Sequence, residues 1–209
     1  MSEEKPPVNL LELWQQPNIS PDYYEQKNII RVTWITMCPY KTYMTTFKGV
    51  KPNSIQSVIA RMLGTALHKE IEARMREQGF TVEKRGYKQL KGCLLSGKCD
   101  VNLGNSVLVD WKLTTYPPKE IKPMHKDQLI QYCNIFEVKH GWVCYLSTAF
   151  SPLWFHVQAD PLRANIYLDP KAEWLANQFY NTKEPVPIPQ WPKECNFCEV
   201  KDNCPRIKC

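Results

Sequence analysis

The chain has 209 residues, of which 43% are hydrophobic and 23% are charged, a composition typical of a globular protein with one sizeable core. No run approaches the roughly 18 apolar residues that a membrane-spanning helix needs, and the acidic, proline-bearing start MSEEKPPVNL does not have the pattern of a signal peptide. We therefore expect a cytoplasmic protein without membrane association. The net charge of +6 is compatible with a polyanionic partner but does not identify one.

The first half of the chain is expected to contain two helices. Residues 1–30 are predicted to be irregular because prolines interrupt any pattern, and residues 33–47 to form a short helix around Cys38. Residues 54–78 have helical spacing with one apolar stripe, and Gly79 marks the end. The stripe consists of Ile55, Val58, Ile59, Met62, Ala66 and Leu67.

Strands follow, interrupted by two further helices. Helices are expected over residues 122–138 and Pro161–Tyr180. The predicted strands are Phe80–Tyr87, Cys93–Leu103, Val107–Leu113, Trp142–Ser147 and Leu153–Gln158. This order predicts a single α/β core in which a mixed sheet is flanked by helices. We divide the chain into an N-terminal arm (1–32), this core (33–183) and a proline-rich arm that carries the last cysteines (184–209).

Asp110 and Lys112 are the first candidates for chemistry. Because side chains alternate along a strand, these two residues share one face, while Val107, Val109 and Trp111 occupy the other and suit a core. An Asp-x-Lys pair alone is better explained by a solvated strand face. Its meaning therefore depends on the residues that lie near it.

The position of Asp100 depends on the turn before the strand of Asp110. A two-residue loop at Gly104-Asn105 would put the two aspartates on opposite faces, whereas a three-residue loop over residues 104–106 sets them opposite each other, about 5 Å apart. We predict the three-residue loop because it gathers the polar residues. Two carboxylates this close repel each other unless a cation lies between them, and an oxygen-rich shell suits Mg²⁺ or Mn²⁺.

Two helical pairs accompany these residues. His68 and Glu72 lie one turn apart on the helix 54–78, and Gln128 and Tyr132 lie one turn apart on the helix 122–138. Neither pair indicates a function by itself, since a lone histidine beside an apolar stripe is more often structural.

The nine cysteines fall into two classes. We predict that Cys93, Cys99, Cys133 and Cys144, which lie in apolar segments, are small buried side chains. Cys195, Cys198 and Cys204 lie close together in sequence and leave a metal site one ligand short. Cys38 is the expected fourth ligand, with Cys209 as the alternative, and zinc or a structural disulfide are alternatives to an iron–sulfur cluster.

The order of these motifs resembles that of a known family. Gly64-x-x-x-His68, Asp100, Asp110-x-Lys112 and Gln128-x-x-x-Tyr132 resemble the RecB-like PD-(D/E)xK nucleases. With one early and three late cysteines, the chain resembles their CRISPR-associated, iron–sulfur exonuclease group, as a cellular or viral member. The resemblance covers residues 33–209. It departs from the family at Asp110, where many relatives carry glutamate.

The resemblance implies a restriction-endonuclease-like core and a role for each matching residue. The implied metal ligands for Mg²⁺ or Mn²⁺ are His68, Asp100, Asp110 and the carbonyl of Leu113. Lys112 would orient the attacking water and stabilise charge on the phosphate, and Gln128 and Tyr132 would position the lysine and the DNA. The implied catalytic set is Asp110, Lys112, Gln128 and Tyr132. The implied ligands of a [4Fe–4S] cluster are Cys38, Cys195, Cys198 and Cys204.

The resemblance also implies a function. It is that of a metal-dependent deoxyribonuclease, a single-stranded DNA exonuclease with endonuclease activity as a further expectation. Such an enzyme would act in CRISPR spacer acquisition or in viral DNA processing, in the cytoplasm of a cell or of a virus's host. Its implied partners are single-stranded DNA, CRISPR adaptation proteins and further copies of itself. Basic residues between Arg61 and Lys91 favour phosphate contacts without singling one out.

The alternative is a non-catalytic DNA-binding protein with a structural zinc or iron–sulfur site. A complete acidic set beside Lys112 argues against it, because a pure binder gains nothing from carboxylates that face phosphates.

Overall fold

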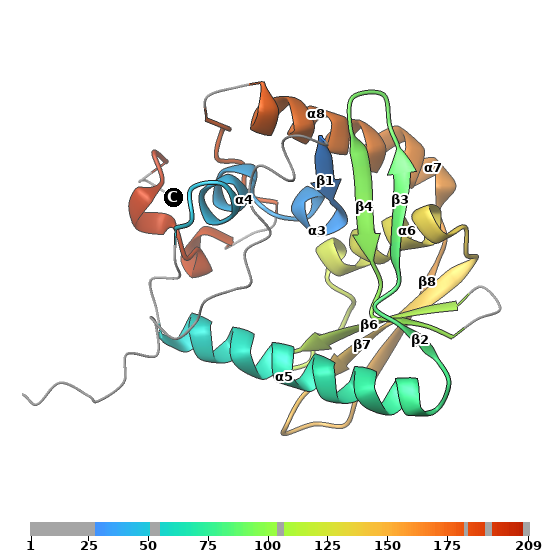
Figure 1. Ribbon diagram of the computed structural model, residues 1–209. Helices are drawn as coiled ribbons and strands as arrows, with labels where there is room; N and C mark the ends of the chain where they lie inside the picture. Colours follow the sequence, from blue (N-terminus) through green and yellow to red (C-terminus); the bar gives the residue numbers. More distant parts are fainter. Residues whose placement is uncertain (1–27, 51–54, 104–106, 182–183, 191–193, 207–209) are drawn as a thin grey trace, which may run out of the picture.

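The computed structural model describes residues 28–50, 55–103, 107–181, 184–190 and 194–206 (Figure 1). Most of the N-terminal arm, the loop 104–106 and Cys209 lie outside these residues. The helices are α3 (Val32–Ile35), α4 (Pro39–Thr46), α5 (Ile55–Glu77), α6 (Pro123–Phe136), α7 (Pro161–Arg163), the π-helix η1 (Ala164–Leu168), α8 (Asp169–Tyr180), and the 3-10 helices η2 (Glu194–Phe197) and η3 (Lys201–Asn203). The strands are β1 (Ile29–Arg31), β2 (Thr81–Val82), β3 (Arg85–Gln89), β4 (Leu94–Lys98), β5 (Val101–Asn102), β6 (Val107–Leu113), β7 (His140–Leu146) and β8 (Leu153–Gln158).

The strands form two sheets instead of the one that we predicted. A three-stranded sheet has the order β1-β4-β3, and a five-stranded sheet has the order β2-β5-β6-β7-β8. Each sheet is mixed, since β1 runs parallel to β4 and β6 runs parallel to β7 while the other neighbours are antiparallel. Chain segments that we predicted as single strands cross from one sheet to the other, at residues 83–84 and again at residues 99–100. The predicted class, mixed sheets flanked by helices, is confirmed.

Helix α6 packs against the three-stranded sheet at two glycines. A Cβ atom on Gly97 would lie 3.0 Å from side-chain atoms of Ile135 and Tyr132, and one on Gly86 would lie 2.7 Å from Ile135 and Phe136. The missing side chains therefore let the helix approach the strands closely. This packing places Gln128 and Tyr132, both buried, beside Lys98 and Asp100, where the chain passes from one sheet to the other.

The beginning of the described chain differs from the prediction in two ways. Ile29 and Ile30 were expected to be irregular but belong to β1, where both are buried in the core. The predicted helix 33–47 is two helices, because Pro39 disfavours a helical conformation of Cys38 and suits the first turn of a new helix. Cys38 is therefore the N-terminal cap residue of α4.

Helix α5 is present as predicted, but its orientation is not the one that its apolar stripe indicated. Val58 is buried, whereas Ile59 and Met62 are each 42% exposed and Ala66 is exposed. The helix runs along the edge of the molecule (Figure 1). The residues on its inward face are polar, and they contribute to the site described below. None of the described helices is both long and apolar enough to cross a membrane.

The remaining core predictions are largely confirmed. The four cysteines expected to be small buried side chains, Cys93, Cys99, Cys133 and Cys144, are all buried. Trp111 departs from its predicted place in the core: it is half-buried, and its ring meets that of Trp154 edge-on at 5.2 Å between centroids. The face of β6 opposite Asp110 is thus covered partly by aromatic side chains of the sheet itself, Trp111 of β6 and Trp154 of β8.

Candidate active site

The hairpin of β5 and β6 determines where the two aspartates lie. Val101 pairs with Val109 in antiparallel register, and the same register sets Asp100 opposite Asp110. This pairing confirms the predicted three-residue connection, although residues 104–106 themselves lie outside the described chain. Both aspartates are buried, at the point where β4 gives way to β5.

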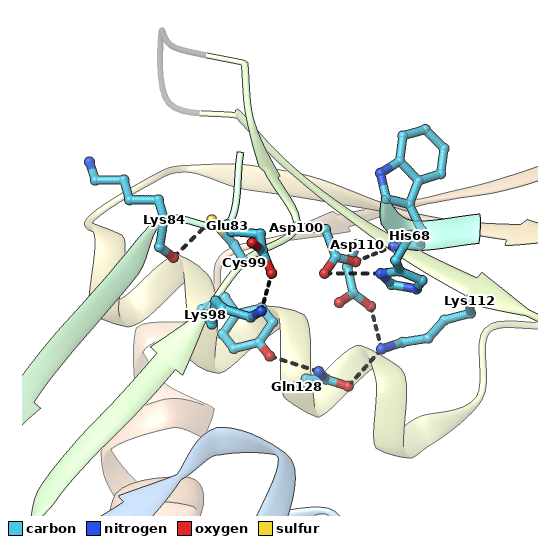
Figure 2. Close-up of polar contacts among 11 residues, drawn as sticks. His68, Glu83, Lys84, Lys98, Cys99, Asp100, Asp110, Lys112 and Gln128 are labelled. Carbon is cyan, nitrogen blue, oxygen red and sulfur yellow. Dashed lines mark hydrogen bonds and ion pairs between the residues drawn. The ribbon is translucent and has the colours of Figure 1, made fainter. Parts of the chain in front are cut away.

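Asp100 is held from two sides. Its Oδ2 accepts a hydrogen bond from the backbone N–H of Trp111 at 2.8 Å, and its Oδ1 lies 3.5 Å from Nδ1 of His68 on α5 (Figure 2). Burial alone would raise the pKa of Asp100, but His68, Lys112 and the Trp111 amide together lower it. The bond to Asp100 in turn raises the pKa of His68. Asp100 is therefore a carboxylate at neutral pH.

Glu72, which was not among the predicted metal ligands, joins His68 and Asp100, which were. Ligand atoms of these three residues all lie within 4.8 Å of one another. Glu72 is buried, and burial followed by the negative charge of Glu83 raises its pKa. Such convergence of one imidazole and two carboxylates is suited to a divalent cation. The spacing of four residues after His68 was a signal, but only the position of α5 shows that Glu72 reaches Asp100.

Asp110 lies beside this group and is only 2% exposed. Burial raises its pKa to about 6, and Asp100 adds to the rise while Lys112 opposes it. Its Oδ2 lies 2.8 Å from Nζ of Lys112, an ion pair in which Oδ2 has no well-aligned hydrogen-bond donor among the described residues. A buried carboxylate oxygen of this kind retains lone pairs for a cation.

Lys112 is fixed by a chain of contacts that leads to α6. Its Nζ donates to Oε1 of Gln128 at 3.0 Å, and Nε2 of Gln128 donates to the hydroxyl of Tyr132 at 2.8 Å (Figure 2). Because the ammonium of Lys112 can only donate, the oxygen of the Gln128 amide faces it and the NH2 group faces the Tyr132 hydroxyl. Sequence analysis proposed that Gln128 and Tyr132 position Lys112, and the structure brings all three together. Leu113, whose carbonyl was predicted as a ligand, ends β6 next to Leu146 of β7 and stays a prediction in that role.

Basic side chains share a pocket with these residues. The pocket has a volume of about 150 Å³, and Asp100, Asp110 and Lys112 line part of it. Arg31 of β1, Arg85 of β3 and Lys98 of β4 also line it. Arg31 was not among the predicted site residues, because it lies in the N-terminal arm 1–32, outside the predicted core. The pocket thus combines a possible cation site with cationic side chains that suit an anionic ligand.

Residues 194–206, which carry Cys195, Cys198 and Cys204 and are called the C-terminal segment below, lie against α4 and away from this pocket (Figure 1). Cys38 forms a small buried cluster with Tyr40 and Val200, and Cys198 and Cys204 pack against that cluster. Burial raises the pKa of the Cys38 thiol, while backbone N–H groups of Lys41, Ile188 and Tyr40 that point to the sulfur oppose the rise. No disulfide joins the cysteines of the described ranges.

Two further contacts fasten this segment. The N–H of Cys38 donates to Oε1 of Glu194 at 3.0 Å, and the Tyr40 hydroxyl donates to the carbonyl of Asn203 at 2.5 Å. Cys195 lies in the turn that these contacts hold, where its carbonyl accepts from the N–H of Cys198. The structure therefore brings the C-terminal segment to the N-terminal helix, and the cluster that these cysteines would bind stays a prediction.

Comparison with known proteins gives matches among solved structures. No family model and no curated protein matches the sequence. The crystal structure of SSO0001 matches with a TM-score of 0.68 at 19% identity, over 94% of this chain and 92% of that one. A predicted exonuclease from Eubacterium rectale matches with a TM-score of 0.55 at 13% identity, over 87% and 90% of the two chains.

A third structure is that of LHK-Exo, an alkaline exonuclease from Laribacter hongkongensis, in complex with dAMP. It matches with a TM-score of 0.52 at 11% identity, over 77% of this chain and 92% of that one. At these identities the comparisons establish a common architecture. The chain has the fold of these exonucleases.

Proposed function

We propose that the chain is a metal-dependent nuclease that hydrolyses DNA phosphodiester bonds. The observation that carries the proposal is the convergence of His68, Glu72 and Asp100 beside the ion pair of Asp110 and Lys112. Aspartate, glutamate and histidine around a site that also presents a lysine are the groups that metal-assisted phosphodiester hydrolysis requires. The exonucleases with the same fold support this class of reaction.

The residues fit Mg²⁺ or Mn²⁺ on physical grounds. The pKa values of Glu72 and Asp110 are both raised by burial, so the protein alone does not compensate their negative charge. A divalent cation at this place removes that penalty. The donor set, mainly carboxylate oxygen with one imidazole, suits Mg²⁺ and is well matched to Mn²⁺. His68, Glu72, Asp100 and Asp110 would hold the ion, with the Leu113 carbonyl as a further ligand.

Lys112 supplies the positive charge and the N–H donors that the carboxylates lack. When bound, a divalent cation offsets the negative charge of the phosphate and makes water a better nucleophile. Nζ of Lys112 has three N–H donors: Gln128 accepts one in a hydrogen bond, and a second faces Asp110 in the ion pair without good alignment. The third is left to hold the attacking water or a phosphate oxygen as its charge increases. Arg31 and Arg85 bind the phosphates of the strand that enters the pocket.

The substrate preference and the biological role that we propose rest on the order of the sequence motifs and on one surface feature. We infer a single-stranded DNA exonuclease, with additional endonuclease activity, in CRISPR spacer acquisition or viral DNA processing. Tyr116 and Phe150 are 73% and 50% exposed, and their rings pack at 6.1 Å between centroids. They follow β6 and β7 at the end where Lys112 lies, and exposed aromatic rings there suit unpaired bases.

A nuclease assay tests the proposal. The full chain is incubated with end-labelled single-stranded and double-stranded DNA, with Mn²⁺, Mg²⁺, or EDTA. We expect metal-dependent digestion that favours single strands and that Asp100→Asn abolishes. Asp127→Asn is the matched control, because Asp127 of α6 pairs with Arg163 of α7 and not with the residues of the site. Equal digestion by the wild type and Asp100→Asn, or no digestion by the wild type, would contradict the proposed nuclease activity.

Glu72 provides a sharper test of the metal site. We expect Glu72→Gln to weaken Mn²⁺ binding about 10- to 100-fold, because the amide keeps the shape but loses the charge. Glu70→Gln is the control on the same helix, since Glu70 is exposed and pairs with Arg74. The measurement is a Mn²⁺ titration followed by electron paramagnetic resonance. Equal affinities of the two variants would remove Glu72 from the ligand set.

We also propose that Cys38, Cys195, Cys198 and Cys204 hold a [4Fe–4S] cluster. The packing of Cys198 and Cys204 against the cluster of Cys38 supports the proposal, and backbone N–H groups that point to the Cys38 sulfur offset part of the rise in its pKa that burial causes. The chain purified without oxygen is expected to contain iron and sulfide, and Cys198→Ala to lose both. Cys144→Ala, in the buried core, is expected to retain them. Zinc in place of iron and sulfide would contradict the cluster.

A further inference from the structure

The inward face of α5 is polar. Arg61, His68 and Glu72 face the rest of the protein, whereas Ile59 and Met62 on the other side are substantially exposed. Burial of apolar surface therefore contributes less to holding α5 than it does in an ordinary amphipathic helix. The position of His68 and Glu72 depends correspondingly more on the polar contacts that α5 makes.

One of these contacts is made with the C-terminal segment. Arg61 forms an ion pair with Oε2 of Glu199, and Oε1 of Glu199 lies 3.4 Å from Nζ of Lys41 on α4. Glu199 is buried, and burial lowers the pKa of Arg61. The carboxylate thus joins three parts of the chain, α4, α5 and the C-terminal segment, that are distant in sequence.

The C-terminal segment is well placed to act as an anchor. Glu199 lies between Cys198 and Val200, and Val200 is buried against Cys38. The carboxylate of Glu194 accepts N–H groups of both Cys38 and Gln190, so the segment is fastened independently of Glu199. A fixed carboxylate can orient a helix in a way that a side chain on a loose tail cannot.

The link reaches the metal site through the helix itself. Arg61 and His68 are seven residues apart, which is two turns and about 10 Å along one face of α5. We propose that Glu199 is a positioning residue for the metal site: through Arg61 it orients α5 so that His68 and Glu72 meet Asp100. The inference rests on the proposed metal site and requires no direct contact between Glu199 and the ion.

The test measures metal affinity in the full chain, with Mn²⁺ alone as the probe. We expect Arg61→Met, which retains an apolar stem, to weaken Mn²⁺ binding about 10-fold, by analogy with the loss of groups that orient ligands. Glu199→Gln is expected to weaken it to a similar extent, and the double variant no further, because the two side chains act through one contact. Arg74→Met is the control, since Arg74 pairs with exposed Glu70 on the same helix.

Two readouts separate positioning from general damage. The iron and sulfide content of Arg61→Met is expected to match that of Arg74→Met, because Glu194 fastens the C-terminal segment independently of Glu199. Its thermal midpoint is expected to stay above the temperature of the titration, which shows that the variant is folded. An Arg61→Met protein that binds Mn²⁺ as tightly as the wild type overturns the inference alone. A wild type whose Mn²⁺ affinity is unaffected by Glu72→Gln overturns the proposed metal site and this inference together. Additive losses in the double variant also overturn it.

Discussion

Asp110→Asn is expected to abolish nuclease activity and, at the same time, to stabilise the metal-free protein at pH 8. Burial raises the pKa of Asp110 to about 6. A carboxyl with a raised pKa holds its proton more tightly in the folded state than in the unfolded chain, so the folded state loses stability as the pH rises from about 4 through 6. Asparagine carries no charge and escapes this penalty.

The size and the pH dependence of the effect are both measurable. With EDTA present, urea unfolding at pH 8 is expected to give a free energy of unfolding about 1–3 kcal/mol higher for Asp110→Asn than for the wild type. At pH 4.5, where the folded carboxyl is protonated but the unfolded one is still largely ionised, the difference is expected to fall to less than half of this, and it should vanish near pH 3. Activity of the variant is expected to fall by more than about a hundredfold, because a ligand of the cation is lost. A variant that is less stable at both pH values would show that Asp110 stabilises the fold through Lys112.

Lys112→Met is expected to separate metal binding from hydrolysis. Activity with Mn²⁺ should fall about 10²- to 10³-fold, the usual effect of removing one group that stabilises charge in a transition state. Mn²⁺ affinity at pH 8 should be retained or increase, because a positive charge next to the cation site is removed. Lys112 also lowers the pKa of Asp110. Without it, the pH at which Mn²⁺ binding is half-maximal should therefore rise.

Gln128→Leu provides the graded comparison for this experiment. It leaves the charge of Lys112 in place but removes the oxygen that holds Nζ, so a loss of activity intermediate between wild type and Lys112→Met is expected. Single-turnover digestion and a Mn²⁺ titration on the same samples are the two measurements. Loss of Mn²⁺ binding by Lys112→Met would assign the lysine a structural role instead.

Much of the hairpin could be predicted from the sequence. Alternation along a strand places Asp110 and Lys112 on one face, and the number of residues after Asn102 decides where Asp100 lies. These are local rules with a period of two. The helical partners were predictable as pairs, since His68 with Glu72 and Gln128 with Tyr132 follow from one turn of helix.

Other features depend on long-range packing, which a single sequence does not reveal. Glu72 reaches Asp100 because α5 turns its polar face inward, contrary to the rule that the apolar stripe is buried. β1 is three residues long and is paired in parallel with β4, so it shows no alternation. Arg31 enters the pocket only through that pairing. Arg61 was grouped with residues that favour DNA phosphates, yet it is already engaged by Glu199.

The bond between Cys38 and Glu194 has a consequence for the order of folding. It joins residues 156 positions apart, whereas the β5–β6 hairpin and the helices close over short distances in sequence. Contacts between such distant residues carry the larger loss of chain entropy and tend to form late. The C-terminal segment should therefore dock after the hairpin and the helices have formed, and a cluster of the proposed kind would be loaded onto an already shaped protein.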